Sequence, residues 1–268
     1  MNSQPPEKRR WGFTLVDWLL LAAIAGLTVQ LSAMVLGPTV EWWKNRPRPG
    51  VQVCQQYIAT DGEPRLWADY LLYLPKDYDA NRRWPLIVFL HGAGERGHDL
   101  EIVRRSTLPS LVEQGQTMEA ILLSPQCPAN TNWSPETIVK LVEHVSGRFS
   151  VDEDRVYLTG YSLGGWGTWT TAMYDPGRFA AVAPLAGGGD TQQAEQLKDV
   201  PIWAFHGDKD TVVPLEATQR MVDAVKKCGG QVKFTVYSGV GHGISEMTYQ
   251  NREFFEWLLG QHRGQRPR

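Results

Sequence analysis

Residues 155–165 read RVYLTGYSLGG, and this stretch decides how the chain is interpreted. Residues 156–159 form a run typical of a buried β-strand, and the residues after Ser162 have a helical pattern. Between strand and helix lies the motif G-x-S-x-G, in the context that a nucleophile elbow requires. A sharp turn there lifts the serine hydroxyl above the sheet, and side chains larger than glycine at positions 160 and 164 would collide. Ser162 is therefore the predicted nucleophile.

Strand-length apolar runs alternate with helical patterns on both sides of this motif. The middle runs are apolar on both faces, as parallel strands covered by helices are. The run 66–74 alternates more, which predicts an edge or antiparallel strand. The predicted strands are 66–74, 86–90, 120–124, 155–159, 180–184, 201–206 and 232–237, and the predicted helices are 135–147, 162–174, 214–228 and 248–259. This series predicts an α/β domain at 51–260 with a doubly wound, mostly parallel sheet.

A serine hydroxyl needs a neighbouring base before it can act as a nucleophile at neutral pH. Two histidines follow Ser162 at a distance that leaves room for an acid on a later strand. His262 lies in the polar C-terminal tail, 261–268, whereas His242 lies in the glycine-rich stretch GVGHG after the last predicted strand. Active sites of open α/β folds assemble at the carboxyl ends of the strands. His242 is therefore the predicted general base.

Two aspartates compete for the role of the acid in the stretch FHGDKDTVVP, residues 205–214. Asp208 directly follows the turn glycine, where it is suited to bracing the loop through backbone hydrogen bonds. Asp210 lies farther along, where a carboxylate can reach the loop of His242. We favour Asp210 as the acid that holds one tautomer of His242 and stabilises its imidazolium; Asp208 is the alternative.

Acyl transfer also requires donors for the developing oxyanion, and backbone amides serve best. One predicted donor is the amide of Leu163, the residue after the nucleophile. The other is the amide of Ala93 in the glycine-rich stretch HGAGERG, residues 91–97, whose backbone can curl toward a ligand. This stretch does not match the motif of a phosphate-binding loop, because no Gly-Lys-Ser/Thr follows it.

The first fifty residues have a different composition. Residues 18–40 are 23 residues without a charge, long enough to cross a bilayer as a helix, and tryptophans flank the run on both sides. We predict a basic tail at 1–17, a transmembrane anchor at 18–38 and a linker at 39–50; a cleaved signal peptide, with secretion of the product, is the alternative. Basic residues balance across the span, and the short N-terminal tail favours an extracytoplasmic domain.

Composition narrows the class of protein further. A net charge of −2 gives no basic field for nucleic acid. Cys54, Cys127 and Cys228 fit neither a zinc spacing nor a disulfide-dense scaffold, so one disulfide and three free thiols both stay open. We expect no cofactor and no metal ion. The sequence leaves the oligomeric state open.

Five motifs, in order and at workable spacing, resemble those of known α/β-hydrolases: HGAGERG (91–97), SPQCP (124–128), GYSLGG (160–165), HGDKDTVVP (206–214) and YSGVGH (237–242). The chain is similar over about residues 52–259 to the phospholipase/carboxylesterase and predicted secreted peptidase type, related to dienelactone hydrolases and to the catalytic domains of prolyl oligopeptidases. The resemblance implies a triad of Ser162, Asp210 and His242, with the amides of Ala93 and Leu163 in the oxyanion hole.

The resemblance also suggests roles for residues around that triad. Trp133 is expected to line the substrate pocket, with a packed loop aromatic as the alternative. His91 and His206 belong to turn motifs and are expected to be structural. Glu95 and Arg96 are expected to brace the oxyanion loop as an ion pair.

The predicted function is hydrolysis of carboxylic esters through an acyl-serine intermediate. A serine peptidase of the prolyl oligopeptidase type without a propeller is the alternative, and a non-catalytic binding protein on the same fold is disfavoured because the triad residues are all present. No sizeable insertion separates the predicted strands 180–184 and 201–206, so no lid is expected there. The open site favours small or exposed, polymer-borne esters as substrates.

Overall fold

The computed structural model describes residues 45–59 and 66–264 of the chain. The chain divides into two units, Met1–Arg46 and Pro47–Arg268, and the described sheet belongs to the second. The predicted tail at 1–17, the predicted anchor at 18–38 and the first half of the predicted linker, 39–44, lie outside the described residues. Within the described part of the chain, none of the helices has the length and apolar character needed to cross a bilayer.

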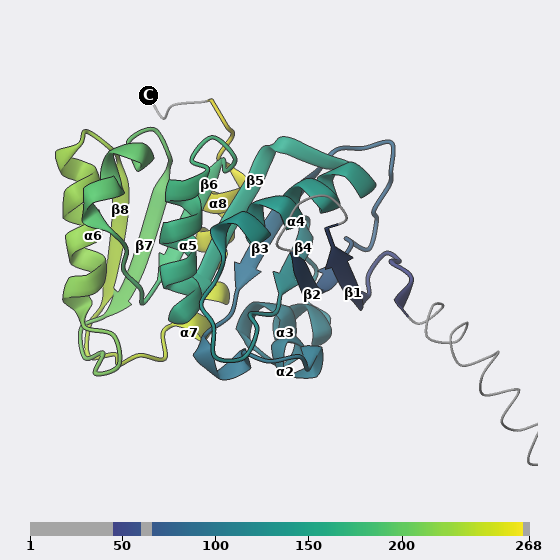
Figure 1. Ribbon diagram of the computed structural model, residues 1–268, viewed down its shortest axis with the longest axis horizontal. Helices are drawn as coiled ribbons and strands as arrows, with labels where there is room; N and C mark the ends of the chain where they lie inside the picture. Colours follow the sequence, from purple (N-terminus) through teal and green to yellow (C-terminus); the bar gives the residue numbers. More distant parts are fainter. Residues whose placement is uncertain (1–44, 60–65, 265–268) are drawn as a thin grey trace, which may run out of the picture. The chain divides into compact units, whose positions relative to one another are not determined.

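One eight-stranded sheet runs through the second unit in the order β1-β2-β4-β3-β5-β6-β7-β8 (Figure 1). Strands β3 to β8 run parallel to one another, whereas β2 is antiparallel to both β1 and β4. The strands are β1 (Gln52–Ile58), β2 (Trp67–Tyr73), β3 (Trp84–Leu90), β4 (Ile121–Pro125), β5 (Val151–Tyr161), β6 (Ala181–Leu185), β7 (Ile202–Gly207) and β8 (Val232–Tyr237). The antiparallel strand expected at 66–74 is confirmed, but β1, which the pattern did not predict, occupies the edge.

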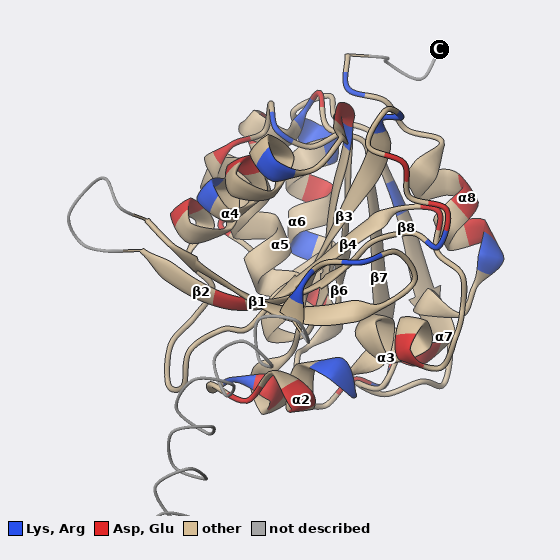
Figure 2. Ribbon diagram, turned by 90° about the vertical axis from the view of Figure 1, so that its right-hand side faces the viewer, with Lys and Arg blue, Asp and Glu red and all other residues tan. Residues whose placement is uncertain are grey.

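Helices cover both faces of this sheet, as the doubly wound pattern predicts (Figure 1). Along β3, Leu86, Val88 and Leu90 face one apolar layer, and Ile87 and Phe89 face the other. The first layer packs against α4 (Pro135–Arg148), α5 (Leu163–Tyr174), α6 (Leu215–Lys227) and the 3₁₀ segment η2 (Thr191–Leu197); the second packs against α3 (Thr107–Glu113), α7 (Ser245–Tyr249) and α8 (Arg252–Leu259). Charged side chains gather on helices and loops (Figure 2), which leaves the sheet interior apolar.

Local capping explains where several helices begin and end. Ser134 accepts a hydrogen bond from the amide of Thr137 and Pro135 is the first helical residue, as the sequence predicts for α4. The predicted helix 248–259 is wrong as a single element. It divides into α7 and α8 because the side chain of Asn251 accepts from the amide of Glu253 and starts a new helix.

Four short helical elements of the described residues were absent from the predicted pattern: η1 (Ala93–Glu95), α2 (Leu100–Arg104), α3 and η2. The polar tail predicted at 261–268 also begins against the domain, because Arg263 binds Asp154 through both its backbone amide and its guanidinium. Cys54, Cys127 and Cys228 are free thiols, which resolves the choice that the sequence left open.

Candidate active site

Ser162 occupies a strained turn between β5 and α5. Its φ of 58° and ψ of −116° lie outside the regions that side chains other than glycine favour. Its amide donates a 2.9 Å hydrogen bond to the carbonyl of Leu185 at the end of β6, and its carbonyl accepts from the amide of Trp166. Because the neighbouring strand and the following helix hold the backbone on both sides, the strained conformation persists.

The glycines of this turn are required by contact with backbone atoms. A Cβ atom at Gly164 would lie 1.9 Å from the carbonyl oxygen of Leu90, and one at Gly160 would lie 2.5 Å from the carbonyl oxygen of Gly164. At Gly165 it would lie 2.2 Å from the carbonyl oxygen of Leu185. These backbone atoms cannot move aside as the end of a flexible side chain could. The collision expected from the sequence at positions 160 and 164 is therefore present, and it extends to position 165.

Ser162, His242 and Asp210 form one hydrogen-bonded series. The Oγ atom of Ser162 lies 2.9 Å from Nε2 of His242, and Nδ1 of His242 lies 2.7 Å from Oδ2 of Asp210. Each residue follows the carboxyl end of a different strand, β5, β8 and β7 respectively. Because these strands are parallel, their carboxyl ends share one edge of the sheet, and three residues far apart in the chain meet there.

Asp210 is fully buried, yet it stays ionised. Burial alone would raise the pKa of this carboxyl group. Hydrogen bonds from the His242 ring and from the amides of Val213 and Val212 outweigh that effect and hold the pKa below its usual value. The ionised carboxylate can only accept, so Nδ1 of His242 carries the proton and Nε2 is free to accept from the Ser162 hydroxyl.

Asp208, the alternative acid, has a different contact. Its Oδ1 accepts a 2.7 Å hydrogen bond from the amide of Gly239, and its Oδ2 lies 3.4 Å from the hydroxyl of Ser238. Asp208 therefore braces the turn after β8 instead of facing His242. Its bracing role follows the sequence argument, although the bonds reach a neighbouring loop and not its own.

The predicted oxyanion donors each begin a helical segment. Leu163 is the first residue of α5 and Ala93 the first of η1, and amides at these positions have no acceptor within their own helix. The loop that carries Ala93 passes beside the nucleophile, since a Cβ atom at Gly92 would lie 3.6 Å from Cβ of Ser162. Both amides therefore lie near Ser162 and have no acceptor within their own helices.

The expected ion pair between Glu95 and Arg96 is wrong. The guanidinium of Arg96 instead donates to the carbonyl oxygens of Ala93 and Thr131, at 3.2 and 3.1 Å. Glu95 turns inward, and its Oε2 would lie 3.4 Å from a Cβ atom at Gly92. Burial raises the pKa of its carboxyl group, although hydrogen bonds from backbone amides oppose the shift. Arg96 therefore braces the loop of Ala93 without an ion pair to Glu95.

His91 and Trp133 stabilise the loop of Ala93 through hydrogen bonds to its backbone. Nε2 of His91 accepts from the amide of Cys127, and Nδ1 donates to the carbonyl of Gly92 at 2.7 Å. Burial lowers the pKa of His91 to about 4, so the ring stays neutral. The indole of Trp133 donates to the carbonyl of His91 at 3.2 Å and meets its ring edge-on. His91 thus has the structural contacts expected of it.

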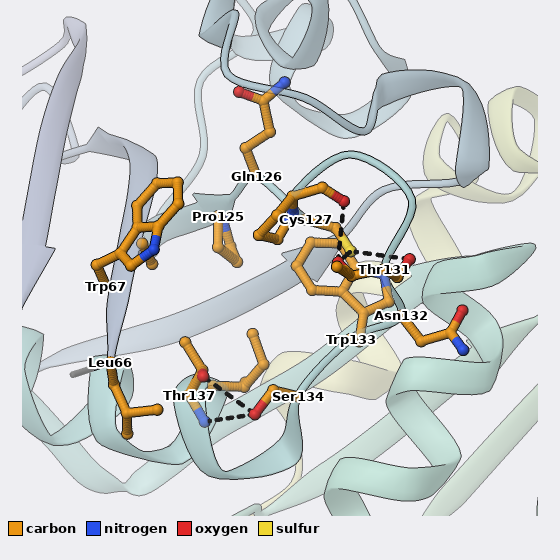
Figure 3. A pocket seen from close by; sticks show the side chains of 13 residues that line it. Leu66, Trp67, Pro125, Gln126, Cys127, Thr131, Asn132, Trp133, Ser134 and Thr137 are labelled. Carbon is orange, nitrogen blue, oxygen red and sulfur yellow. Dashed lines mark hydrogen bonds between the residues drawn. The ribbon is translucent and has the colours of Figure 1, made fainter. Parts of the chain in front are cut away.

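Two cavities adjoin Trp133. One of about 350 Å³ borders Leu163 and is lined by Asn132, Trp133, Leu163, Trp166, Gly167 and Thr170. The other, of about 240 Å³, lies between Trp133 and Trp67 (Figure 3). Neither is lined by a charged side chain among the described residues. Trp133 is therefore packed and also forms a wall of each cavity, while its expected role in the substrate pocket stays a prediction.

Two residues at this site were not singled out by their chemistry in the sequence. The hydroxyl of Tyr161 donates to the carbonyl of His242 at 2.9 Å, with the two rings 5.0 Å apart. The indole of Trp166 is 38% exposed and stands one turn after the nucleophile. The sequence feature that could have identified them is their place in the motif GYSLGGW, because residues close to the serine in this turn lie at the same edge of the sheet.

In residues 45–59 and 66–264, no three His, Cys, Asp or Glu side chains gather in a way that would hold a metal ion. The groups assembled around Ser162 are instead a hydroxyl, an imidazole, a carboxylate and two free amides. These are the groups that nucleophilic acyl transfer uses.

Several known proteins are similar to the chain. The model of the dienelactone hydrolase family matches residues 122–253. Probable feruloyl esterase C of Aspergillus niger (strain ATCC MYA-4892 / CBS 513.88 / FGSC A1513) is 28% identical over 155 residues, which cover 55% of this chain and 57% of that protein. The crystal structure of a thermostable esterase is 35% identical with a TM-score of 0.68, and the match covers 78% of this chain and 63% of the other.

The chain thus spans less than two thirds of the length of each of these two proteins. The feruloyl esterase module from Clostridium thermocellum is only 16% identical, but it matches 84% of this chain and 94% of its own with a TM-score of 0.60, which supports the fold. Sheet order, turn geometry and these similarities agree on one classification. The chain has an α/β-hydrolase fold, and the proteins that it resembles in sequence include carboxylesterase-type members of that superfamily.

Proposed function

We propose that the protein hydrolyses carboxylic esters through an acyl-serine intermediate. The observation that supports this most strongly is the series Ser162–His242–Asp210, with hydrogen bonds of 2.9 and 2.7 Å. The same groups that a serine esterase needs stand in the required order, from nucleophile to base to carboxylate. The esterases among the similar proteins support ester hydrolysis as the reaction.

In the proposed reaction, Oγ of Ser162 attacks the ester carbonyl carbon while Nε2 of His242 takes the hydroxyl proton. The carbonyl oxygen becomes an oxyanion that accepts from the amides of Leu163 and Ala93. Collapse of this intermediate breaks the bond to the alcohol oxygen, which receives the proton from His242. A water molecule then repeats these steps on the acyl-serine and releases the acid. Asp210 stabilises the imidazolium throughout and keeps its own charge.

The walls beside the nucleophile favour an uncharged substrate. Trp133 and Trp166 supply flat apolar surface next to Leu163, and no charged side chain lines that cavity among the described residues. Planar or ring-bearing groups bury well against indole faces. We therefore propose small or polymer-borne esters with an uncharged acyl or alcohol group. The aromatic acyl group named for the feruloyl esterases is one such group.

Ser162→Ala tests this function directly. The variant should lose hydrolysis of p-nitrophenyl acetate and labelling by a fluorophosphonate probe, with an unchanged circular dichroism spectrum. Wild-type protein should hydrolyse p-nitrophenyl esters much faster than peptide p-nitroanilides, which serve as the control for peptidase activity. Labelling of a folded Ser162→Ala variant would remove Ser162 from the mechanism, and a preference for the anilides would favour a peptidase.

A further inference from the structure

His206 has contacts that a purely structural turn residue does not need. It lies near the end of β7 with a fully buried side chain. Its Nδ1 is 2.7 Å from Oγ1 of Thr218, and its Nε2 is 2.9 Å from the carbonyl oxygen of Val213. The same Nε2 is 3.2 Å from Oδ2 of Asp210, the oxygen that also accepts from His242.

The hydrogen-bond partners of the His206 ring define its protonation state. The Thr218 hydroxyl has one hydrogen, and its oxygen lies 2.5 Å from the carbonyl oxygen of Gly187, which can only accept. The hydroxyl must therefore donate to Gly187, and Nδ1 of His206 must donate to Thr218. On the other side of the ring, Nε2 faces a carbonyl oxygen and a carboxylate oxygen, which are both acceptors. Each ring nitrogen thus requires a proton.

We propose that His206 is a buried imidazolium that pairs with Asp210 and acts as a positioning residue for the triad. The pair leaves neither charge uncompensated in the interior. Oδ2 of Asp210 then receives hydrogen bonds from two imidazole rings, while its Oδ1 receives the amides of Val212 and Val213. These bonds leave the carboxylate no freedom to rotate away from His242.

The positive charge of His206 also has a consequence for His242. During acylation His242 becomes an imidazolium on the other side of Asp210, so a single carboxylate then faces two positive rings. A positively charged His206 therefore opposes the second positive charge that His242 acquires during acylation. This consequence rests on the proposed esterase function, whereas the protonation of His206 does not.

The surroundings of His206 contain few other charges that could have this effect. The residue opposite on β8 is Val236, and α6 contributes Thr218. The loop between β7 and α6 contributes Asp210 and the carbonyl of Val213. Among the contacts in the described part of the chain, Asp210 is the charged side chain that faces the ring, and His242 and Tyr161 are titratable groups beyond it.

The first experiment reads the protonation of His206 without any substrate. In ¹⁵N-labelled wild-type protein, two-dimensional NMR of the histidine rings should show one buried ring with a proton on both nitrogens throughout pH 6 to 9. His206→Gln should remove that signal and so assign it. A His206 ring with one bare nitrogen across this range would overturn the proposal, whatever the enzyme's activity.

The second experiment separates charge from hydrogen bonding. His206→Gln keeps a donor near the position of Nε2 but has no charge, and His206→Asn keeps a donor only near the position of Nδ1. We expect kcat to fall by about threefold in the Gln variant and about tenfold or more in the Asn variant. In both, the acid limb of the kcat/KM profile should move up by about half to one pH unit, because the charge opposing protonation of His242 is gone.

Thr218→Val provides a test that leaves the imidazole in place, should the His206 variants not fold. It removes the acceptor of the Nδ1 proton with little change in volume, so the acid limb should move in the same direction, while Thr218→Ser should leave it unchanged. An acid limb that stays in place in folded His206→Gln and Thr218→Val would refute the electrostatic role. A wild-type protein without esterase activity would refute the proposed function and leave the NMR result standing.

Discussion

Asparagine in place of Asp210 would keep the shape of the carboxylate and change only what it can donate and accept. In the structure, Oδ1 of Asp210 accepts from the amides of Val212 and Val213, and Oδ2 accepts from Nδ1 of His242 at 2.7 Å. The side-chain oxygen of the introduced asparagine would retain the first two bonds, which places its NH₂ group against His242. Two donors cannot share a hydrogen bond, so the His242 ring must give up its Nδ1 proton.

The consequence is transmitted across the ring to Ser162. With Nδ1 unprotonated, the neutral ring carries its proton on Nε2, which then faces the Ser162 hydroxyl and cannot accept from it. The base is lost although its position is unchanged. By comparison with other triads, kcat should fall about 10⁴-fold, which corresponds to about 5 kcal/mol of transition-state stabilisation. The measurement is steady-state hydrolysis of p-nitrophenyl acetate.

Asp208→Asn is the matched control, because it makes the same chemical change two residues away. The asparagine oxygen can still accept the 2.7 Å bond from the amide of Gly239. Since this bond braces a turn and does not touch His242, kcat should change by less than about threefold. If Asp208→Asn lost more activity than Asp210→Asn, with both variants folded, the assignment of the acid would be wrong.

The Asp210→Asn variant also allows a test by stability. The pKa of Asp210 is held below its usual value, so its ionisation stabilises the fold at pH values above the unfolded-state pKa of about 3.9. This contribution disappears as the pH falls through the lower, folded-state pKa. The difference in unfolding free energy between wild type and Asp210→Asn should therefore shrink as the pH is lowered below about 4. A difference that grows in acid would contradict the proposed charge state.

Three further predictions concern the loop of His242 and the N-terminal segment. Tyr161→Phe removes the hydroxyl that donates to the carbonyl of His242 and should lower kcat by about three- to tenfold. Because burial raises the pKa of Tyr161 to about 12, that ratio should stay constant from pH 6 to 10, and a ratio that approaches one at high pH would refute the role. Residues 18–38, outside the described part of the chain, should retain the full-length protein in carbonate-washed membranes; a soluble product that starts near residue 34 would indicate a cleaved signal peptide. Protease added to intact spheroplasts should digest the hydrolase domain, and survival of that domain until lysis would reverse the predicted orientation.

Short elements show where sequence patterns stop being informative. Segment α3 is only seven residues long, and a helix of that length is marginal without packing. It exists because Leu108, Leu111 and Val112 are buried against the sheet. Strand β1 carries polar side chains at Gln55 and Gln56, and it is a strand because it pairs with β2 along its whole length. Each element is stabilised by partners distant in the chain, which no local pattern contains.

The amino-acid sequence alone determined the alternation of strands and helices, the elbow at Ser162 and the loops that carry Asp210 and His242. It could do so because periodicity and glycine placement are local properties, and because parallel strands bring their carboxyl ends to one edge. Only the tertiary structure showed that Asp210, and not Asp208, contacts His242, separated Arg96 from Glu95, and placed Tyr161 against His242 and His206 against Asp210. Those outcomes depend on contacts of about 3 Å between loops far apart in sequence, which strand register and loop conformation define together.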